Sequence, residues 1–481
     1  MTELKRRLGL FDATAIVAGS MIGSGIFIVS ADMARTLGSP GWLLIAWVLT
    51  GVITLAAALS YGELAAMMPQ AGGQYVYLRE AFGKLPAFLY GWTLFAVIQS
   101  GTIAAVAVAF AKFTGVIFPI ISNSNWVLKI NCFHNYNIGL NTENLLAMFS
   151  IILLTWINTR GLESGKWIQN IFTSTKILSL LGIIFIGITI GRNHSAITHN
   201  LQNIWSSSWI HTLPKFHIEN LNSLSIFSAL GVAMVGSLFS SIAWDTVTYT
   251  AGETINPKKN IPLSLGIGVG IVTLLYVLVN VAYLSVLPLH GNINGSDVFS
   301  HGIQFASNDR VGTACAEMIF SSSGALIMAI LIMISTFGCN NGIILSTARV
   351  YYAMAKDGLF FKKAGELNKH SVPQYALIIQ CIWSCILCIT GTYSNLLDYV
   401  IFAVLIFYML TICGLIVLRI KKPNVERPYK AIGYPFIPLI YIIFAAAISI
   451  DLLILKPLYT WPGLIIVLIG LPIYYLWNQE R

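Results

Sequence analysis

Hydrophobic positions in this chain form long blocks, and polar positions gather between the blocks rather than alternating with them. A hydrocarbon core about 30 Å thick needs about 20 apolar residues in a spanning helix. Twelve blocks reach or approach this length, at approximately residues 11–35, 42–68, 86–120, 143–159, 167–190, 225–252, 262–288, 314–355, 374–391, 395–419, 434–454 and 460–477. The pattern predicts an all-α polytopic membrane protein with twelve transmembrane helices.

Two of the blocks carry small and polar residues at their centres. The first contains Gly19-Ser20-Met21-Ile22-Gly23-Ser24-Gly25-Ile26-Phe27, and the sixth contains Gly236-Ser237-Leu238-Phe239-Ser240-Ser241-Ile242-Ala243-Trp244. Glycine costs a helix about 1 kcal/mol relative to alanine, and lipid offers no partners to backbone groups that leave the helix. Such an interruption is stable where it lines an enclosed cavity. Both stretches are therefore predicted to be broken helices at a binding site near the membrane midplane.

The two interrupted stretches also align with each other. Both read Gly-Ser, two apolar residues, a small residue, Ser, two small or apolar residues and an aromatic residue. They begin two halves of five spans each, which indicates an inverted repeat. We expect a first repeat over residues 1–190, a second over 191–420 and two further helices over 421–481. In the alternative interpretation, the small residues only allow helices to pack closely.

Composition and charge support a membrane location. The chain is 56% hydrophobic and 10% charged, with a mean hydropathy of +0.76, whereas a soluble domain has about 25% charged residues. Of 28 Lys and Arg residues, twenty fall on one side of the predicted spans and seven on the other, with Lys176 inside a span. This bias predicts that both termini are cytoplasmic. We expect a plasma membrane, and the lack of long polar tails favours a bacterial inner membrane.

An interrupted helix presents two poles. The N–H groups that begin its second half favour a carboxylate, and the carbonyls that end its first half favour an ammonium group. Together they suit the zwitterion of an α-amino acid. We expect the backbone of Ser24 and Gly25 to bind the carboxylate, and carbonyls near Met21, Phe239 and Ile242 to bind the amine. The predicted substrate site consists of Met21, Ile22, Gly23, Ser24, Gly25, Phe239, Ser240, Ile242 and Trp244.

Further polar and aromatic residues in the spans are candidates for coupling and gating. Lys176 lies about ten residues, or about 15 Å of helix, from the inner surface, too far for snorkelling. It either replaces a coupling Na⁺ with a permanent ammonium group or exchanges a proton. Asp245 is expected to sense a proton, contact a cation or cap a helix, and Asn341 to need a buried partner. Phe239 is expected to close over the substrate or to pack, and Glu63 to serve an inner gate or lie at the interface.

With these residues the chain resembles the amino acid–polyamine–organocation superfamily, and within it the L-amino acid transporter-like branch. The resemblance rests on residues 19–27 together with Gly252-Glu253-Thr254-Ile255-Asn256-Pro257, Ile261-Pro262, Ser346-Thr347-Ala348-Arg349, Lys356-Asp357-Gly358 and Arg427-Pro428-Tyr429-Lys430. It implies a LeuT-like arrangement of five plus five helices with two appended, and alternating access to amino acids. Phe239 matches the family's gating aromatic residue, and Lys176 matches the lysine that replaces a sodium ion in sodium-independent members. Asp245 falls where some members carry an acid tied to proton sensing.

The residues and the resemblance together predict a function. The chain is expected to be a sodium-independent secondary transporter of amino acids, acting as a proton symporter or an exchanger. The tenth span is apolar around Phe402-Ala403-Val404-Leu405, where some members place a polar pocket residue, and this favours neutral, apolar substrates. An amine, polyamine or cationic amino acid carrier is the alternative, and it would need a carboxylate-lined pocket.

Other classes of protein lack support in the sequence. No metal cluster, nucleophile–base pair or P-loop indicates an enzyme, and no charged pore lining or filter indicates a channel. The expected interactions are with an amino acid substrate, protons and membrane lipids. No cofactor, metal, nucleic acid or partner subunit is expected.

Overall fold

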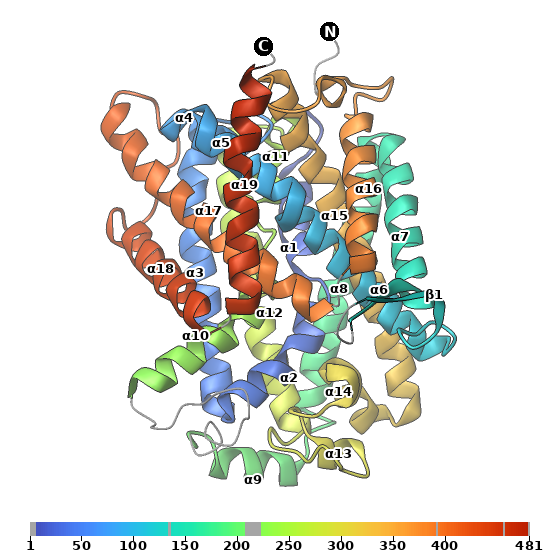
Figure 1. The fold of residues 1–481 in the computed structure, drawn as a ribbon. Helices are drawn as coiled ribbons and strands as arrows, with labels where there is room; N and C mark the ends of the chain where they lie inside the picture. Colours follow the sequence, from blue (N-terminus) through green and yellow to red (C-terminus); the bar gives the residue numbers. More distant parts are fainter. Residues whose placement is uncertain (1–5, 133–135, 207–222, 391–392, 456, 480–481) are drawn as a thin grey trace.

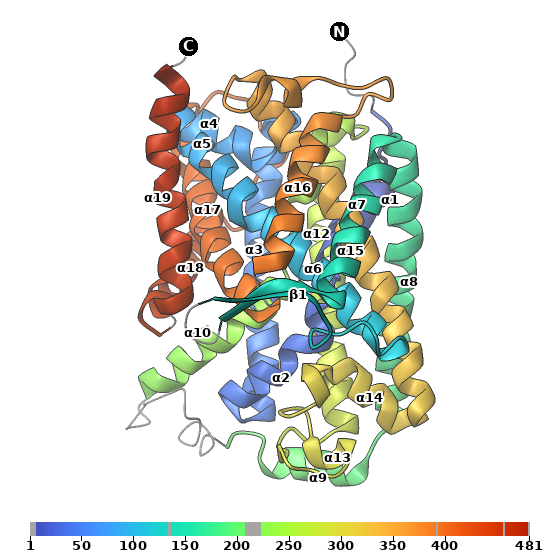
Figure 2. The ribbon, with the colours of Figure 1, turned by 45° about the vertical axis from the view of Figure 1, so that its right-hand side comes forward.

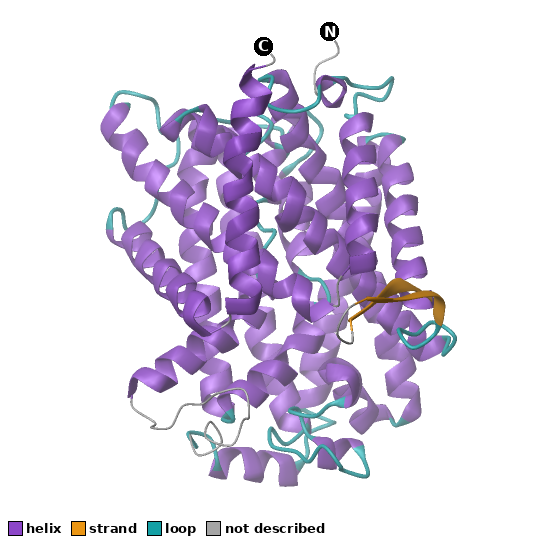
Figure 3. Cartoon of the chain, viewed as in Figure 1, coloured by secondary structure: helices purple, strands orange, loops and turns teal. Residues whose placement is uncertain are grey.

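The computed structural model describes residues 6–132, 136–206, 223–390, 393–455 and 457–479. The described chain is a bundle of helices with a two-stranded antiparallel hairpin of β1 (Trp126–Cys132) and β2 (Tyr136–Asn141) at its side (Figure 3). The helices are α1 (Leu10–Met21), α2 (Gly25–Leu37), α3 (Pro40–Met67), α4 (Gln74–Phe82), α5 (Lys84–Thr93), α6 (Gln99–Ile117), α7 (Thr142–Thr159), α8 (Leu162–Ile188), α9 (His194–Gln202), α10 (Ser223–Ser240), α11 (Thr246–Tyr249), α12 (Pro257–Val286), α13 (Val298–His301), α14 (Val311–Phe320), α15 (Ser322–Lys356), α16 (Gln374–Thr390), α17 (Tyr393–Lys421), α18 (Phe436–Leu455) and α19 (Pro457–Gln479). The hairpin was not predicted, because it falls in the connection between the third and fourth apolar blocks.

Each predicted apolar block contains helix, which confirms the polytopic helical fold. Within the described residues, eight helices are long and apolar enough to cross a membrane, and the pair α1 and α2, bent by 40°, makes a ninth. The other three predicted blocks hold α7, α10 and α16, which have 18, 18 and 17 residues. Length and composition therefore do not establish the count of twelve by themselves. The helix α10 is too short to be counted as a full span because it ends at Ser240, within the predicted break.

The outer helices expose apolar side chains. Leu178 and Phe185 on α8, Ile443 and Ile454 on α18 and Leu476 on α19 are mostly exposed. Figure 2 shows α18 and α19 at one edge of the bundle and α8 at the opposite edge. Exposed apolar side chains spread over several long helices are what a hydrocarbon environment requires. The chain is an integral, multi-pass membrane protein.

The two ends of the described chain lie at the same end of the molecule, and α9, α13 and α14 lie at the other (Figure 1). An even number of membrane crossings gives this arrangement. The terminal residues 1–5 and 480–481, which are predicted to be cytoplasmic, lie outside the described residues. We call the end that carries the termini the inner end and the opposite end the outer end.

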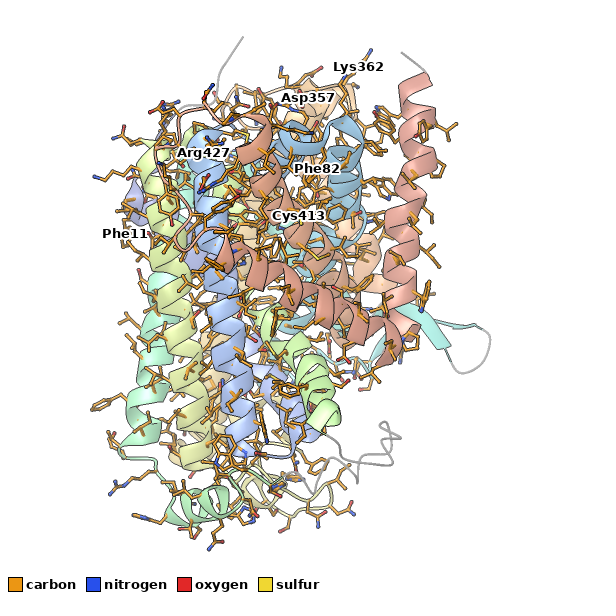
Figure 4. The ribbon with its side chains drawn as sticks, turned by 90° about the vertical axis from the view of Figure 1, so that its left-hand side faces the viewer. Phe11, Phe82, Asp357, Lys362, Cys413 and Arg427 are labelled. Carbon is orange, nitrogen blue, oxygen red and sulfur yellow. The ribbon has the colours of Figure 1, made fainter. Side chains whose placement is uncertain are left out.

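The inner end is held by buried and half-buried ion pairs. Figure 4 shows Asp357 and Arg427 at this end. Asp357 accepts a hydrogen bond from Tyr75 at 2.8 Å and forms an ion pair with Arg79. Glu63 is fully buried and forms ion pairs with Arg419 and Arg427. These pairs join α3 and α4 to later parts of the chain.

The broken helices lie at the centre of the bundle. The helix α1 packs against α8, α12 and α15, and α2 packs against α10 and α14. In the sequence alignment of the two breaks, Met21 stands opposite Leu238, and the helices end at Met21 and Ser240. The helices after the two breaks differ in length, since α11 has four residues whereas α2 has thirteen. Ala243, with φ of 66°, turns the chain within the second break.

Candidate substrate site at the two helix breaks

Side chains from two helices, α8 and α15, satisfy carbonyl groups of the first break. The Lys176 ammonium of α8 donates to the Gly19 carbonyl at 2.7 Å. The Cys339 thiol of α15 donates to the Ser20 carbonyl at 3.0 Å. The Ser335 hydroxyl of α15 lies 3.3 Å from the carbonyls of both Ile22 and Gly23. These contacts supply the partners that backbone groups outside a helix need within a membrane.

Tyr276 of α12 connects the two breaks. Its hydroxyl lies 2.9 Å from the Met21 carbonyl at the end of α1 and 3.0 Å from the Ser240 carbonyl at the end of α10. The Trp47 ring packs edge-on against the Tyr276 ring, with centroids 5.4 Å apart. Because a phenol has one proton to donate, it can fully satisfy only one of these carbonyls at a time. Two helix C-termini therefore meet at one point that retains capacity for a further donor, which is the environment an ammonium group prefers.

The opposite pole lies at the start of α2. Ser24 is the N-cap residue, and its side chain makes no capping hydrogen bond. A helix leaves the N–H groups of its first turn without intrahelical partners, and these groups with the helix dipole favour an anion. Gly25 stands directly against α10, since a Cβ atom added there would lie 3.1 Å from the Cα of Ser240. The N-terminus of α2 in the first break and the C-terminus of α10 in the second break are thus in contact.

A glycine at position 25 is expected to be necessary for transport. In the Gly25→Ala variant the methyl group would meet Ser240 and force the two breaks apart, a kind of overpacking that typically costs about 1–3 kcal/mol. We expect uptake to fall at least about tenfold, which corresponds to about 1.4 kcal/mol. Gly182→Ala on α8 is the matched control, because a Cβ atom there meets nothing within 4 Å. Equal uptake by the two variants in liposomes would contradict the prediction.

Polar side chains continue from the first break into α7, α8 and α15. The Gln169 amide and the Thr173 hydroxyl of α8 donate to the Ala15 carbonyl at 3.3 and 3.1 Å. The Asn341 amide donates to the Gln169 side-chain carbonyl at 3.4 Å, and the Asn158 amide donates to the Asn341 side-chain carbonyl at 2.9 Å. Asn341 therefore has the buried partners that it was expected to need. One of these partners, Gln169, itself donates to the Ala15 carbonyl of α1.

Asp245, in the second break, lies among tyrosines. Its carboxylate accepts hydrogen bonds from the hydroxyls of Tyr249 and of Tyr408, the latter at 2.7 Å. The Tyr249 and Tyr90 hydroxyls are 2.8 Å apart and extend the cluster. Although Asp245 occupies the N-cap position of α11, its side chain makes no cap hydrogen bond. The helix-capping interpretation of Asp245 is therefore wrong, because the two phenols bind the carboxylate instead.

Two small cavities adjoin the second break. Cavity A, of about 10 Å³, borders Asp245, Tyr249 and Gln99. Cavity B, of about 20 Å³, borders Trp244 and Tyr441. The two cavities share a wall formed by Ile242, Val404 and Tyr408. Each cavity has room for about one water molecule, so an amino acid would enter only after the helices around the breaks separate.

The structure brings most of the predicted site residues together but gives them different surroundings. Met21, Ile22, Gly23 and Gly25 lie in the first break, and Ser240 and Ile242 in the second. Phe239 is buried and borders neither cavity A nor cavity B, and Trp244 packs against the Tyr61 and Tyr408 rings, with centroids 4.8 and 5.0 Å apart. The substrate-binding and gating roles of all these residues remain predictions.

Several functional candidates were missed from the sequence. Tyr276, Ser335, Tyr249 and Tyr408 sit in apolar blocks, where nothing in the sequence distinguishes them from packing residues. One signal was available, because Gln169 and Thr173 stand seven and three residues before Lys176 and so share its helix face. A second feature is the π-helical turn Leu94–Ile98 between α5 and α6, which borders cavity A at both of its ends. Such turns are frequent at functional sites.

Comparison with known proteins connects this geometry to a family. The family model described as "Amino acid permease" matches residues 8–474. The chain is 32% identical over 474 residues to the human "Large neutral amino acids transporter small subunit 2", covering 98% of this chain and 80% of the relative. It is 28% identical over 482 residues to the mouse "Asc-type amino acid transporter 1", covering 98% and 81%. It is also 28% identical over 478 residues to the mouse "b(0,+)-type amino acid transporter 1", covering 99% and 88%.

These relatives bear on two further expectations. The human relative is named a small subunit, so the expectation of no partner subunit is not supported. The three relatives are mammalian proteins, so the expectation of a bacterial inner membrane is not supported either.

Proposed function

Because the chain belongs to the amino acid permease family, we propose that it is a sodium-independent secondary transporter of neutral, apolar amino acids. The substrate binds between the two helix breaks, and the protein opens alternately to the two sides of the membrane. Members of the family are permeases rather than enzymes, and the names of the relatives describe amino acid transporters.

The observation that carries the proposal is the meeting of opposite poles at the two breaks. The Met21 and Ser240 carbonyls converge on one hydroxyl, at 2.9 and 3.0 Å, and are the proposed acceptors of the substrate ammonium. The N-terminus of α2 at Gly25 is the proposed donor to the carboxylate. An α-amino acid carries both groups on adjacent carbons, which makes it the solute that this pair of poles fits best.

A neutral, apolar side chain fits the surroundings of the second break. Ile242 and Val404 form part of the wall between cavities A and B. A cationic substrate would need a carboxylate that is available to it, but two tyrosine hydroxyls already bind Asp245. The alternative of an amine, polyamine or cationic amino acid carrier is therefore less well supported.

Sodium independence rests on Lys176. Its side chain is 1% exposed, and its ammonium group donates to the Gly19 carbonyl at 2.7 Å. A cation fixed at a carbonyl in the last turn of a broken helix occupies the kind of position where a transporter of this type coordinates Na⁺. We propose that Lys176 supplies this charge permanently, so that no sodium ion is needed.

We also propose that both termini are cytoplasmic.

The test is uptake of labelled L-leucine into liposomes that contain the purified protein. We expect saturable uptake that is unchanged when choline replaces sodium. Exchange predicts faster uptake when the liposomes are loaded with unlabelled leucine, whereas proton symport predicts faster uptake with an inward proton gradient. Leucine methyl ester, which lacks the carboxylate, should compete poorly. Sodium-dependent uptake, or equal competition by the ester, would contradict the proposal.

A further inference from the structure

A third cavity lies near the outer end, away from the two breaks. This outer cavity has a volume of about 170 Å³, more than ten times the roughly 10–15 Å³ that one water molecule needs. Arg310, Thr313 and Glu317 border it from the start and one face of α14, and His301 borders it from the end of α13. The remaining lining is mostly small or apolar. The cavity is therefore large enough for a small organic solute, with its charged groups on one helix.

Two polar groups on its wall lack partners within the described part of the chain. The Thr313 side chain is 7% exposed, and its hydroxyl has no hydrogen-bond partner there. The Arg310 Nε atom is buried and also has none. The nearby carboxylates are shared with other cations, since Asp309 binds Arg35 at 2.6 Å and the charge of Glu143 acts on Lys112 as well as on Arg310. Buried polar groups are costly unless they are paired, so these two indicate a ligand that the described chain does not supply.

The start of α14 adds a third favourable element. Arg310 is its N-cap residue, and no side chain caps the first turn. The N–H groups of this turn and the positive end of the helix dipole favour an anion at the position that Arg310 and Thr313 already favour. An arginine can bind a carboxylate through two parallel hydrogen bonds. These groups together suit a carboxylate.

Glu317 decides what kind of carboxylate fits. It borders the same cavity and follows Arg310 by seven residues, so the two lie about 10 Å apart along α14 and within about 20° of the same face. Its negative charge would repel a simple anion but attract an ammonium group. We propose that the outer cavity binds a zwitterionic amino acid, with the carboxylate on Arg310 and Thr313 and the ammonium group on Glu317.

This outer site rests on the proposed function, because its ligand is the solute that the breaks would transport. The helix α14 packs against α2, and a Cβ atom at Gly312 would lie 2.8 Å from the Phe27 ring of α2. The outer cavity is therefore one helix away from the carboxylate pole at the start of α2. An amino acid held there would be positioned on the outer side, before it reaches the breaks.

The test is equilibrium binding of labelled L-leucine to the purified full-length protein and three variants. We expect the wild-type protein to show two classes of site. Arg310→Gln should weaken one class at least about tenfold and leave the other unchanged, because it removes a bidentate charged donor. Gly25→Val, which blocks the site at the breaks, should lose that class of site and keep the class that Arg310→Gln weakens. The double variant Gly25→Val with Arg310→Gln should bind at neither site.

Further variants separate the outcomes. Thr313→Val and Glu317→Gln each remove one contact with little change in size, and both should weaken the class of site that Arg310→Gln weakens. They carry the test if Arg310→Gln does not fold, as judged by size-exclusion chromatography. Wild-type stoichiometry and affinity in Arg310→Gln, Thr313→Val and Glu317→Gln would overturn the outer site while leaving the breaks intact. Displacement of leucine from Gly25→Val by acetate as effectively as by glycine would show a simple anion site instead. No binding of any amino acid to the wild-type protein would remove both this inference and the proposed function.

Discussion

Replacing Arg349 by methionine is expected to destabilise the protein by about 3–5 kcal/mol, the range for removing one partner of a buried ion pair. The Arg349 side chain is 0% exposed. Its guanidinium binds the Glu253 carboxylate through two contacts of 3.1 and 3.2 Å, and donates to the Leu345 carbonyl at 2.5 Å. Without Arg349, the Glu253 carboxylate would remain buried and unpaired. Thermal or denaturant unfolding in detergent measures the loss.

The Arg349–Glu253 pair holds more than two side chains. The Glu253 carbonyl accepts hydrogen bonds from the Arg7 and Leu8 amides at 2.8 and 3.0 Å, and the Ile255 amide donates to the Leu8 carbonyl at 2.8 Å. The segment that enters α1 is thereby fixed to the segment that comes after α11. The pair joins the inner ends of both broken helices to α15, so its loss should also loosen the packing at the inner end.

Two comparisons make the Arg349 prediction specific. In the double variant Arg349→Met with Glu253→Met, no unpaired charge remains, and replacing a buried pair by apolar residues is often nearly neutral. The double variant should therefore be more stable than Arg349→Met alone. Lys258→Met is the surface control, since the Lys258–Glu426 pair at 3.0 Å is mostly exposed and should contribute less than about 1 kcal/mol. Strictly additive losses in the double variant would show that the pair is not coupled.

The sequence predicted the breaks because their cause is local. Glycine and serine at the centre of an apolar block weaken the helix whatever surrounds them, and α1 ends at Met21 within that stretch. The partners of the break were not predictable in the same way. Glu253 and Arg349 were both noted in family motifs, but 96 residues separate them, and only the packed fold brings them together. The same holds for the hydroxyl of Tyr276, which lies in an apolar block.

The character of a residue was easier to predict than its partner. A lysine inside a span had to be functional or paired, and Lys176 is bound to a break carbonyl rather than extended to the surface. The sequence left Asp245 three uses, which were sensing a proton, contacting a cation or capping a helix. Only the packed fold excludes the cap, because it places the hydroxyls of Tyr249 and Tyr408 on the carboxylate. The outer cavity had no sequence signal, because it depends on how α14 packs against segments distant in the chain.

Replacing Lys176 by methionine is expected to lower the initial rate of leucine uptake at least about tenfold, or about 1.4 kcal/mol in transition-state terms. The variant keeps the apolar stem but removes both the charge and the donor to the Gly19 carbonyl. That carbonyl would lose its partner in a medium that supplies none, and the first break would lose the cation that holds its backbone to α8. Uptake is measured in liposomes, in sodium and in choline.

Three variants separate the charge of Lys176 from its shape. Lys176→Arg keeps the charge on a longer side chain and should retain more uptake than Lys176→Met, although the site is tightly packed. Gln169→Leu removes a neighbouring hydrogen bond to the Ala15 carbonyl at 3.3 Å without changing the charge, and should cost less. Lys258→Met at the inner surface should transport normally. If Lys176→Met transports leucine at the wild-type rate while remaining folded, the charge at the first break is not required, and sodium independence must have another cause.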